Sequence, residues 1–166
     1  FSSHGVFQPM LALRGERPVG RVVALDDRAY NQVHGTHHGF FGLFEAEDDE
    51  EVARALLDAA ADWCKLRGAD LLLGPMNFQT SGDCGLLVEG FGEPPAVSTA
   101  HSSYTYPELF ERLQMRKAWD ALAYKLPLDR EPSGSVLHFA EAVRRSHRVV
   151  LRHPDRHRYD EELDRA

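Results

Sequence analysis

The residues best suited to chemistry lie in a long polar stretch that follows the apolar run LLLGPM. Asn77, Ser81 and Cys84 stand in this stretch, directly after the run. Open α/β sheets bind ligands just beyond the carboxyl ends of their strands, so polar side chains here could orient a small-molecule substrate. Cys84 could act as a nucleophile if its thiolate were stabilised. The alternative is a loop that covers the sheet and carries an inert thiol.

A second group of candidate ligands is the segment HGTHHG, which contains His34, His37 and His38. Imidazole nitrogens at such a spacing can bind a metal ion, but the sequence offers no evident fourth ligand. We therefore predict no metal site and interpret the segment as a polar connection.

The junction EAEDDEE, residues 45–51, is crowded with carboxylates. It stands before a predicted helix, where free N–H groups and a partial positive charge often bind phosphate. Asp48 followed three residues later by Glu51 has the pattern of a capping box, with Asp48 as the N-cap. The sequence therefore predicts that the chain's own carboxylates cap this helix.

A strand–helix–strand unit must position these groups. The segments FFGLFEA and ADLLLGPM read as strands, and the residues between them have the pattern of an amphipathic helix that ends near Gly68. Short connections make the two strands parallel neighbours with a right-handed crossover. The predicted apolar stripe of the helix consists of Val52, Ala55, Leu56, Ala59, Ala60, Trp63 and Leu66.

Turn residues and periodicity predict the remaining elements. They are a hairpin over 6–26, a helical turn within 28–39, a helix over 106–114, a strand over 116–128, a linker over 128–135, a helix over 136–146, a strand over 148–152 and the start of a helix at 158–166.

Composition limits the classes of function. The chain has 166 residues, 43% of them hydrophobic, which suits one domain with a real core. A net charge of −7 argues against a nucleic-acid partner, and no apolar run is long enough to predict a membrane partner. Two cysteines without a C-x-x-C spacing predict reduced thiols and a cytoplasmic location.

Two segments, ALLDAAADWCKLRGADLLLG and YPELFERLQMRKAWDALAYKL, resemble the central and late parts of the GNAT N-acetyltransferases. The resemblance covers roughly residues 6–128. It implies an α/β fold with a mixed, mostly antiparallel central sheet, flanking helices and a central βαβ unit.

The segment NFQTSGDCGLLVEGFGEPP is similar to a bacterial group with two GNAT-like modules in tandem. The resemblance implies a GNAT-like domain over residues 1–128, which could lack its N-terminal part. It implies that residues 129–166 are a linker and the start of a second α/β module, the partner of the first within the chain.

Members of that family bind acyl-CoA where the strand before the central helix diverges from the strand after it. The resemblance therefore implies acetyl-CoA or another acyl-CoA, an amine substrate, and backbone contacts at Phe44, Glu45 and Ala46. Ala53 matches the last position of the family's pyrophosphate-binding loop, while acids replace that loop's other residues. The resemblance thus implies a degenerate pyrophosphate loop.

The tyrosine that some family members use as general acid is replaced here by Phe110. Tyr106 and Tyr124 are the candidate replacements, although the pattern favours a core or rim tyrosine with a satisfied hydroxyl at each position. No residue is clearly suited to either proton transfer, so the sequence leaves open whether the chain is an enzyme. Three functions remain: an acyl-CoA-dependent N-acyltransferase, a non-catalytic binding or scaffolding module, and a small-molecule binding domain that uses the 77–91 loop.

Overall fold

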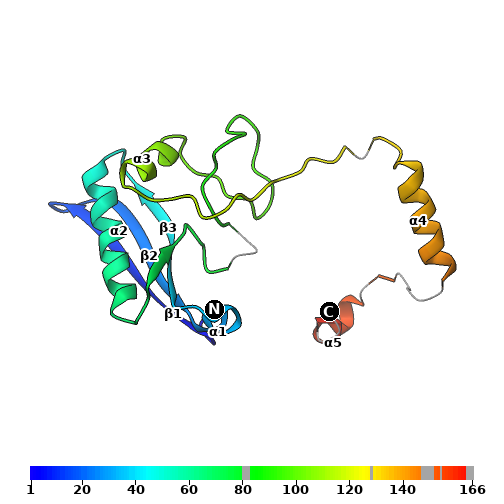
Figure 1. The fold of residues 1–166 in the computed structure, drawn as a ribbon, viewed down its shortest axis with the longest axis horizontal. Helices are drawn as coiled ribbons and strands as arrows, with labels where there is room; N and C mark the ends of the chain where they lie inside the picture. Colours follow the sequence, from blue (N-terminus) through cyan, green and yellow to red (C-terminus); the bar gives the residue numbers. More distant parts are fainter. Residues whose placement is uncertain (80–82, 128, 147–151, 154, 164–166) are drawn as a thin grey trace. The chain divides into compact units, whose positions relative to one another are not determined.

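The structure is a computed structural model that describes residues 1–79, 83–127, 129–146, 152–153 and 155–163. It divides into two units, Phe1–Ala123 and Tyr124–Ala166, and the sheet belongs to the first (Figure 1). The proposal that the C-terminal residues open a second α/β module stays a prediction.

An antiparallel hairpin begins the first unit. Strand β1 (Gly5–Arg14) pairs with β2 (Arg17–Asp27). Gly15 in the turn has a φ of 65°, a left-handed conformation that glycine adopts without strain. The predicted hairpin is confirmed.

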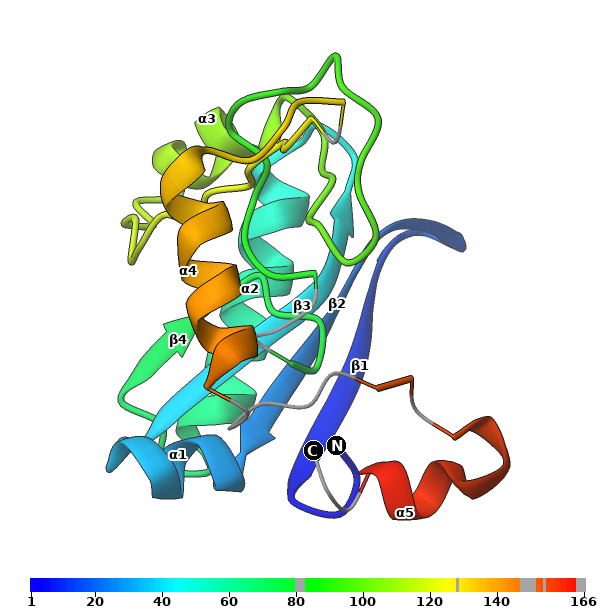
Figure 2. The same cartoon turned by 90° about the vertical axis from the view of Figure 1, so that its right-hand side faces the viewer.

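Helix α1 (Arg28–His34) follows, with the Asp27 carboxylate accepting the N–H of Tyr30 at its start. Strand β3 (His38–Ala46), helix α2 (Glu50–Lys65) and strand β4 (Leu71–Leu73) form the βαβ unit. The strand order is β1-β2-β3-β4, which Figure 2 shows across the sheet. β2 and β3 are antiparallel, whereas β3 and β4 are parallel. The predicted mixed, mostly antiparallel sheet with a central βαβ unit is confirmed.

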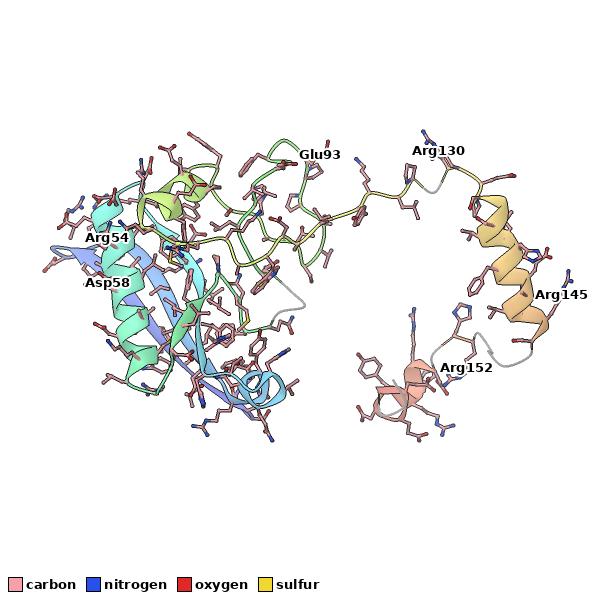
Figure 3. The ribbon with its side chains drawn as sticks, viewed as in Figure 1. Arg54, Asp58, Glu93, Arg130, Arg145 and Arg152 are labelled. Atoms are coloured by element: carbon pink, nitrogen blue, oxygen red, sulfur yellow. The ribbon has the colours of Figure 1, made fainter. Side chains whose placement is uncertain are left out.

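Helix α2 packs on one face of the sheet. Its opposite face is polar: Arg54 and Asp58, labelled in Figure 3, are exposed, and Arg54 pairs with Glu50 at 2.7 Å. The predicted apolar stripe is only partly right, because Ala55, Ala59 and Leu66 are exposed. Small alanines fit either face of a helix, and Leu66 is the C-cap residue, beyond the last helical residue Lys65. The buried residues of α2 are Val52, Ala53, Leu56, Leu57, Ala60 and Cys64.

A second helix, from the C-terminal part of the first unit, packs into the same core. Helix α3 (Tyr106–Arg112) contributes the buried residues Tyr106, Leu109 and Phe110 to the cluster that contains Phe41 and Phe44 of β3. The other face of the sheet buries a smaller cluster. That cluster contains Val23, Leu25, Phe40 and Met76.

The predicted closing strand over 116–128 is wrong for the residues that the structure describes, 116–127, which form no strand. Alternating apolar residues favour a strand only where neighbouring strands offer partners. β4 is three residues long and offers little edge for such pairing. The apolar residues of this segment that are exposed include Trp119, Leu122, Tyr124 and Leu126.

In the second unit, helix α4 (Gly134–Arg145) confirms the helix predicted over 136–146. A short 3₁₀ turn (Arg156–Arg158) leads into helix α5 (Tyr159–Leu163), where a helix start was predicted. The strand predicted over 148–152 lies almost entirely outside the described residues. None of the described helices has the length and apolar character needed to cross a membrane.

Candidate functional site

Strand β3 contains a β-bulge near its carboxyl end. Val23 pairs with Gly42 and Arg21 pairs with Glu45, so two residues of β3 lie opposite Val22 alone. Leu43, one of the two, has a φ of 46°, which is uncommon for a residue other than glycine. Bulges redirect a strand and are frequent beside functional sites. The bulge therefore marks this stretch of β3 as the candidate site.

Strands β3 and β4 diverge just before the bulge. Their parallel pairing ends at Phe40 and Leu73, and the N–H of Met76 then donates to the Phe41 carbonyl at 2.7 Å. A Cβ on Gly42 would collide with the Met76 carbonyl, so only glycine allows the segment after β4 to approach so closely. Within the described residues, β4 does not pair with β3 beyond this point.

Side chains take the place of a partner strand along residues Leu43–Ala46, here called the β3 edge. The Leu43 N–H donates to Oδ1 of Asn77 at 2.7 Å. The Ala46 N–H donates to the hydroxyl oxygen of Tyr106 at 3.0 Å. The fold thus brings a residue predicted for the loop and a residue predicted for catalysis to the same stretch of backbone.

Tyr106 also contacts the carboxylate of Glu45. Its hydroxyl donates to Glu45 Oε2 at 2.9 Å, and its ring packs edge-on against Phe44 with centroids 5.4 Å apart. The tyrosine is 4% exposed, and this burial raises the pKa of its hydroxyl. Tyr106 is therefore protonated at neutral pH and donates its proton toward an exposed carboxylate.

The side chain of Glu45 is the functional candidate that sequence reasoning missed, because only its backbone was considered. The available signal was its place as the one charged residue in the strand FFGLFEA. A charge at the end of an otherwise apolar strand needs a partner or solvent. Here it has both, a hydroxyl donor and an exposed side chain.

The N-terminus of α2 is capped by Asp49. Its Oδ1 accepts the N–H groups of Glu51 at 2.8 Å and Val52 at 3.4 Å, and its Oδ2 accepts from Arg14 at 2.7 Å. Hydrogen bonding from Arg14, and from the Glu51 amide, holds the pKa of Asp49 below its ordinary value. The prediction that the chain's own carboxylates cap the helix is confirmed.

The predicted cap residue is wrong by one position. Asp48 is exposed and lies 3.9 Å from Arg112, while Asp49 occupies the N-cap. The predicted capping box does not form, because it needs Asp48 as the N-cap and Glu51 as the third helical residue, whereas the helix begins at Glu50 after Asp49. Asp49 is favoured because Arg14, from the distant β1, reaches its carboxylate.

This helix terminus does not fit a pyrophosphate. The carboxylate of Asp49 already occupies the position in front of the free N–H groups, and an anion there would be repelled. Ala53, predicted to contact the cofactor, is fully buried, and its N–H donates to the Asp49 carbonyl at 3.1 Å. Its amide is therefore used within the helix.

The other predicted site residues make none of the contacts described above, or they lie outside the described residues. Cys84 forms an isolated bridge with Met76, and burial raises the pKa of its thiol, which disfavours a nucleophilic thiolate. Ser81 lies outside the described residues. Tyr124 is the first residue of the second unit and is 86% exposed. Among the described residues, no group of three or more His, Cys, Asp or Glu side chains could hold a metal ion.

A shallow depression of about 440 Å³ lies at the other end of β3. Its lining includes Arg28, His38, Cys64 and Arg67. Burial raises the pKa of the Cys64 thiol, which faces the backbone carbonyls of Leu25 and Phe40. This depression shares no residue with the β3 edge.

No family model matches the sequence. Two curated proteins are similar to almost the whole chain. The bacterial ceramide synthase of Caulobacter vibrioides is 38% identical over 98% of this chain and 42% of its own length. Protein YghO of Escherichia coli is 32% identical over 98% of this chain and 41% of its own length. The chain thus spans less than half the length of these relatives.

Among solved structures, the chain is similar to a ribosomal-protein-alanine N-acetyltransferase from Brucella melitensis biovar Abortus. The TM-score is 0.43 and the sequence identity is 16%, over 72% of each chain.

Proposed function

We propose that this chain is an N-acyltransferase module that binds an acyl-CoA along the β3 edge and transfers the acyl group to an amine. The observation that carries the proposal is the 38% identity, over 98% of the chain, to a protein named a bacterial ceramide synthase. A ceramide is the amide of a fatty acid and a long-chain amino alcohol. Its synthesis is therefore the acylation of an amine, the reaction class that the sequence resemblance also implies.

The geometry of the β3 edge supports an extended, amide-bearing substrate. Beyond Phe41, β3 no longer pairs with β4. The N–H groups of Leu43 and Ala46 donate instead to the neutral side chains of Asn77 and Tyr106. The pantetheine arm of acyl-CoA carries two amides that could pair with such an edge as an added strand does.

The pyrophosphate of acyl-CoA has no equivalent site in this proposal. The carboxylates around the start of α2 are paired with the chain's own cations, as in Arg14 with Asp49 and Arg17 with Glu47. The binding free energy must then come from the pantetheine and acyl parts.

Glu45 and Tyr106 are the residues that we place in proton transfer. Forming an amide from a thioester makes a C–N bond, breaks a C–S bond, removes a proton from the amine and delivers one to the sulfur. The Glu45 carboxylate takes the proton of the amine. Tyr106, which keeps its proton at neutral pH, supplies the proton to the sulfur and regains it through its hydrogen bond to Glu45.

The proposal is tested with the purified chain, octanoyl-CoA and a long-chain amino alcohol. Calorimetry should detect binding of octanoyl-CoA, and mass spectrometry should detect the amide product. If octanoyl-CoA and acetyl-CoA both fail to bind at millimolar concentration, the proposal is wrong for this chain.

A second candidate is a non-catalytic binding or scaffolding module. The closed N-terminus of α2 favours it, because Asp49 fills the position where an acyl-CoA-binding helix would receive its anion. Binding of octanoyl-CoA without any amide product would support this alternative.

A further inference from the structure

Asn77 joins the segment after β4 to the bulge of β3. Its side-chain oxygen accepts the Leu43 N–H at 2.7 Å, and its own backbone N–H donates to the Asp83 carbonyl at 3.1 Å. The segment that carries Asn77 is held close to β3 by the Met76 hydrogen bond to Phe41 and by the absence of a side chain at Gly42. The backbone of Asn77 is thus held in place by its own segment, while its side chain holds the backbone of the bulge.

The bulge needs such a contact. Leu43 has a φ of 46°, a conformation that costs free energy for any residue with a Cβ and persists only where the surroundings hold it. Its side chain is 38% exposed, so packing holds it only in part. The hydrogen bond from its N–H to Asn77 is the polar contact that fixes its backbone.

We propose that Asn77 is a positioning residue, which fixes the β3 bulge and thereby directs the backbone of Phe44–Ala46 and the carboxylate of Glu45 toward the substrate. This role rests on the proposed acyltransfer at the β3 edge. Asn77 acts through Leu43, two residues before Glu45, so a change at Asn77 shifts the groups that bind and react without removing any of them.

Three variants separate this role from a merely structural one. Asn77→Ala removes the acceptor, whereas Asn77→Asp keeps an oxygen that can accept the Leu43 N–H. Leu43→Gly, added to Asn77→Ala, lets the bulge adopt its positive φ without strain. Gln79→Ala is the matched control, since Gln79 is exposed in the same segment.

The measurements are amide hydrogen exchange at Leu43, affinity for octanoyl-CoA, and kcat/KM for amide formation. In Asn77→Ala the Leu43 amide should exchange faster, and kcat/KM should fall about tenfold or more, as small misplacements of reacting groups do. Asn77→Asp should restore both slow exchange and activity. The double variant Leu43→Gly with Asn77→Ala should recover part of the affinity and of kcat/KM, although its exchange stays fast.

The results that would overturn the inference are distinguishable from one another. If the wild-type chain binds octanoyl-CoA and Asn77→Ala matches it in affinity and kcat/KM, the positioning role is wrong while the proposed function stands. If the wild-type chain binds no octanoyl-CoA, the proposed function fails and the positioning role fails with it. A loss of thermal stability in Asn77→Ala with unchanged kcat/KM of the folded protein would show that Asn77 is only structural.

Discussion

The β3 edge and the N-terminus of α2 are neighbours in sequence, yet they satisfy their backbone N–H groups in opposite ways. At the helix, the charged carboxylate of Asp49 accepts the N–H groups of Glu51 and Val52. At the strand, the neutral side chains of Asn77 and Tyr106 accept the N–H groups of Leu43 and Ala46.

The difference separates two kinds of ligand group. An anion at the helix would meet a carboxylate that Arg14 already stabilises, so phosphate binding is disfavoured there. At the strand edge the groups that accept the N–H groups of Leu43 and Ala46 are neutral, so a neutral amide meets no such repulsion there. The comparison therefore favours a substrate recognised through its amides and its acyl chain.

The largest effect should come from Glu45, which we place as general base. Glu45→Gln should lower kcat about a hundredfold or more, because a general base contributes at least that factor. Affinity for octanoyl-CoA should change little, since the backbone of β3 is unaltered. Steady-state kinetics and calorimetry measure the two quantities. Glu47→Gln, at the exposed Glu47 beyond the strand, is the control and should leave both unchanged.

Tyr106→Phe removes the hydroxyl that accepts the Ala46 N–H and donates to Glu45. Leaving the Ala46 N–H without its partner should lower the free energy of unfolding by about 1 to 3 kcal/mol. Denaturant unfolding measures this loss. Tyr104→Phe, at an exposed tyrosine in the preceding turn, should leave the stability unchanged. Equal stabilities for the two variants would contradict the assigned hydrogen bonds.

Gly42→Ala tests the close approach that separates β4 from the β3 edge. The new methyl group would collide with the Met76 carbonyl, so the segment that carries Asn77 must move. We expect a loss of about 1 to 3 kcal/mol in stability, as in other overpacked sites, together with faster amide exchange at Leu43. Gly92→Ala, where a methyl group meets nothing, is the control. If the amide exchange rate at Leu43 is unchanged, the close approach of the Met76–Asn77 segment to Gly42 does not hold the bulge in place.

The smallest effect concerns the helix terminus and depends on pH. The pKa of Asp49 is depressed in the folded state, so its charged form stabilises the fold above the ordinary carboxyl value of about 3.9. That contribution is lost as the pH falls through the lower, folded value. Asp49→Asn should therefore have a lower melting temperature than wild type at neutral pH, and the difference should shrink in acid. Asp48→Asn, one residue earlier, should show a smaller difference, and the reverse order would contradict Asp49 as the N-cap.

The sequence predicted the parts of the fold that local patterns control. The hairpin around Gly15 and the helix ending before Gly68 follow from turn chemistry and periodicity. The choice of Asp49 over Asp48 could not be predicted, because it depends on Arg14 in a distant strand. The strand predicted over 116–128 is absent from the described residues 116–127, because alternating apolar residues do not reveal whether a partner strand is present.

The candidate site was predictable only as a set of separate residues. Tyr106, Asn77 and Ala46 were each singled out, yet nothing local shows that the first two contact β3. The bulge at Leu43 could not be predicted either, because leucine is not a residue that favours a positive φ. The role of the Glu45 side chain follows from these long-range contacts.

We propose that the β3 edge, and not the helix terminus, provides the affinity for acyl-CoA. The direct measurement compares octanoyl-CoA with octanoyl-pantetheine, which lacks the nucleotide and the pyrophosphate, by calorimetry on the wild-type chain. The two compounds should bind with comparable affinities. A loss of about tenfold or more for octanoyl-pantetheine, equal to about 1.4 kcal/mol of binding free energy, would contradict the proposal.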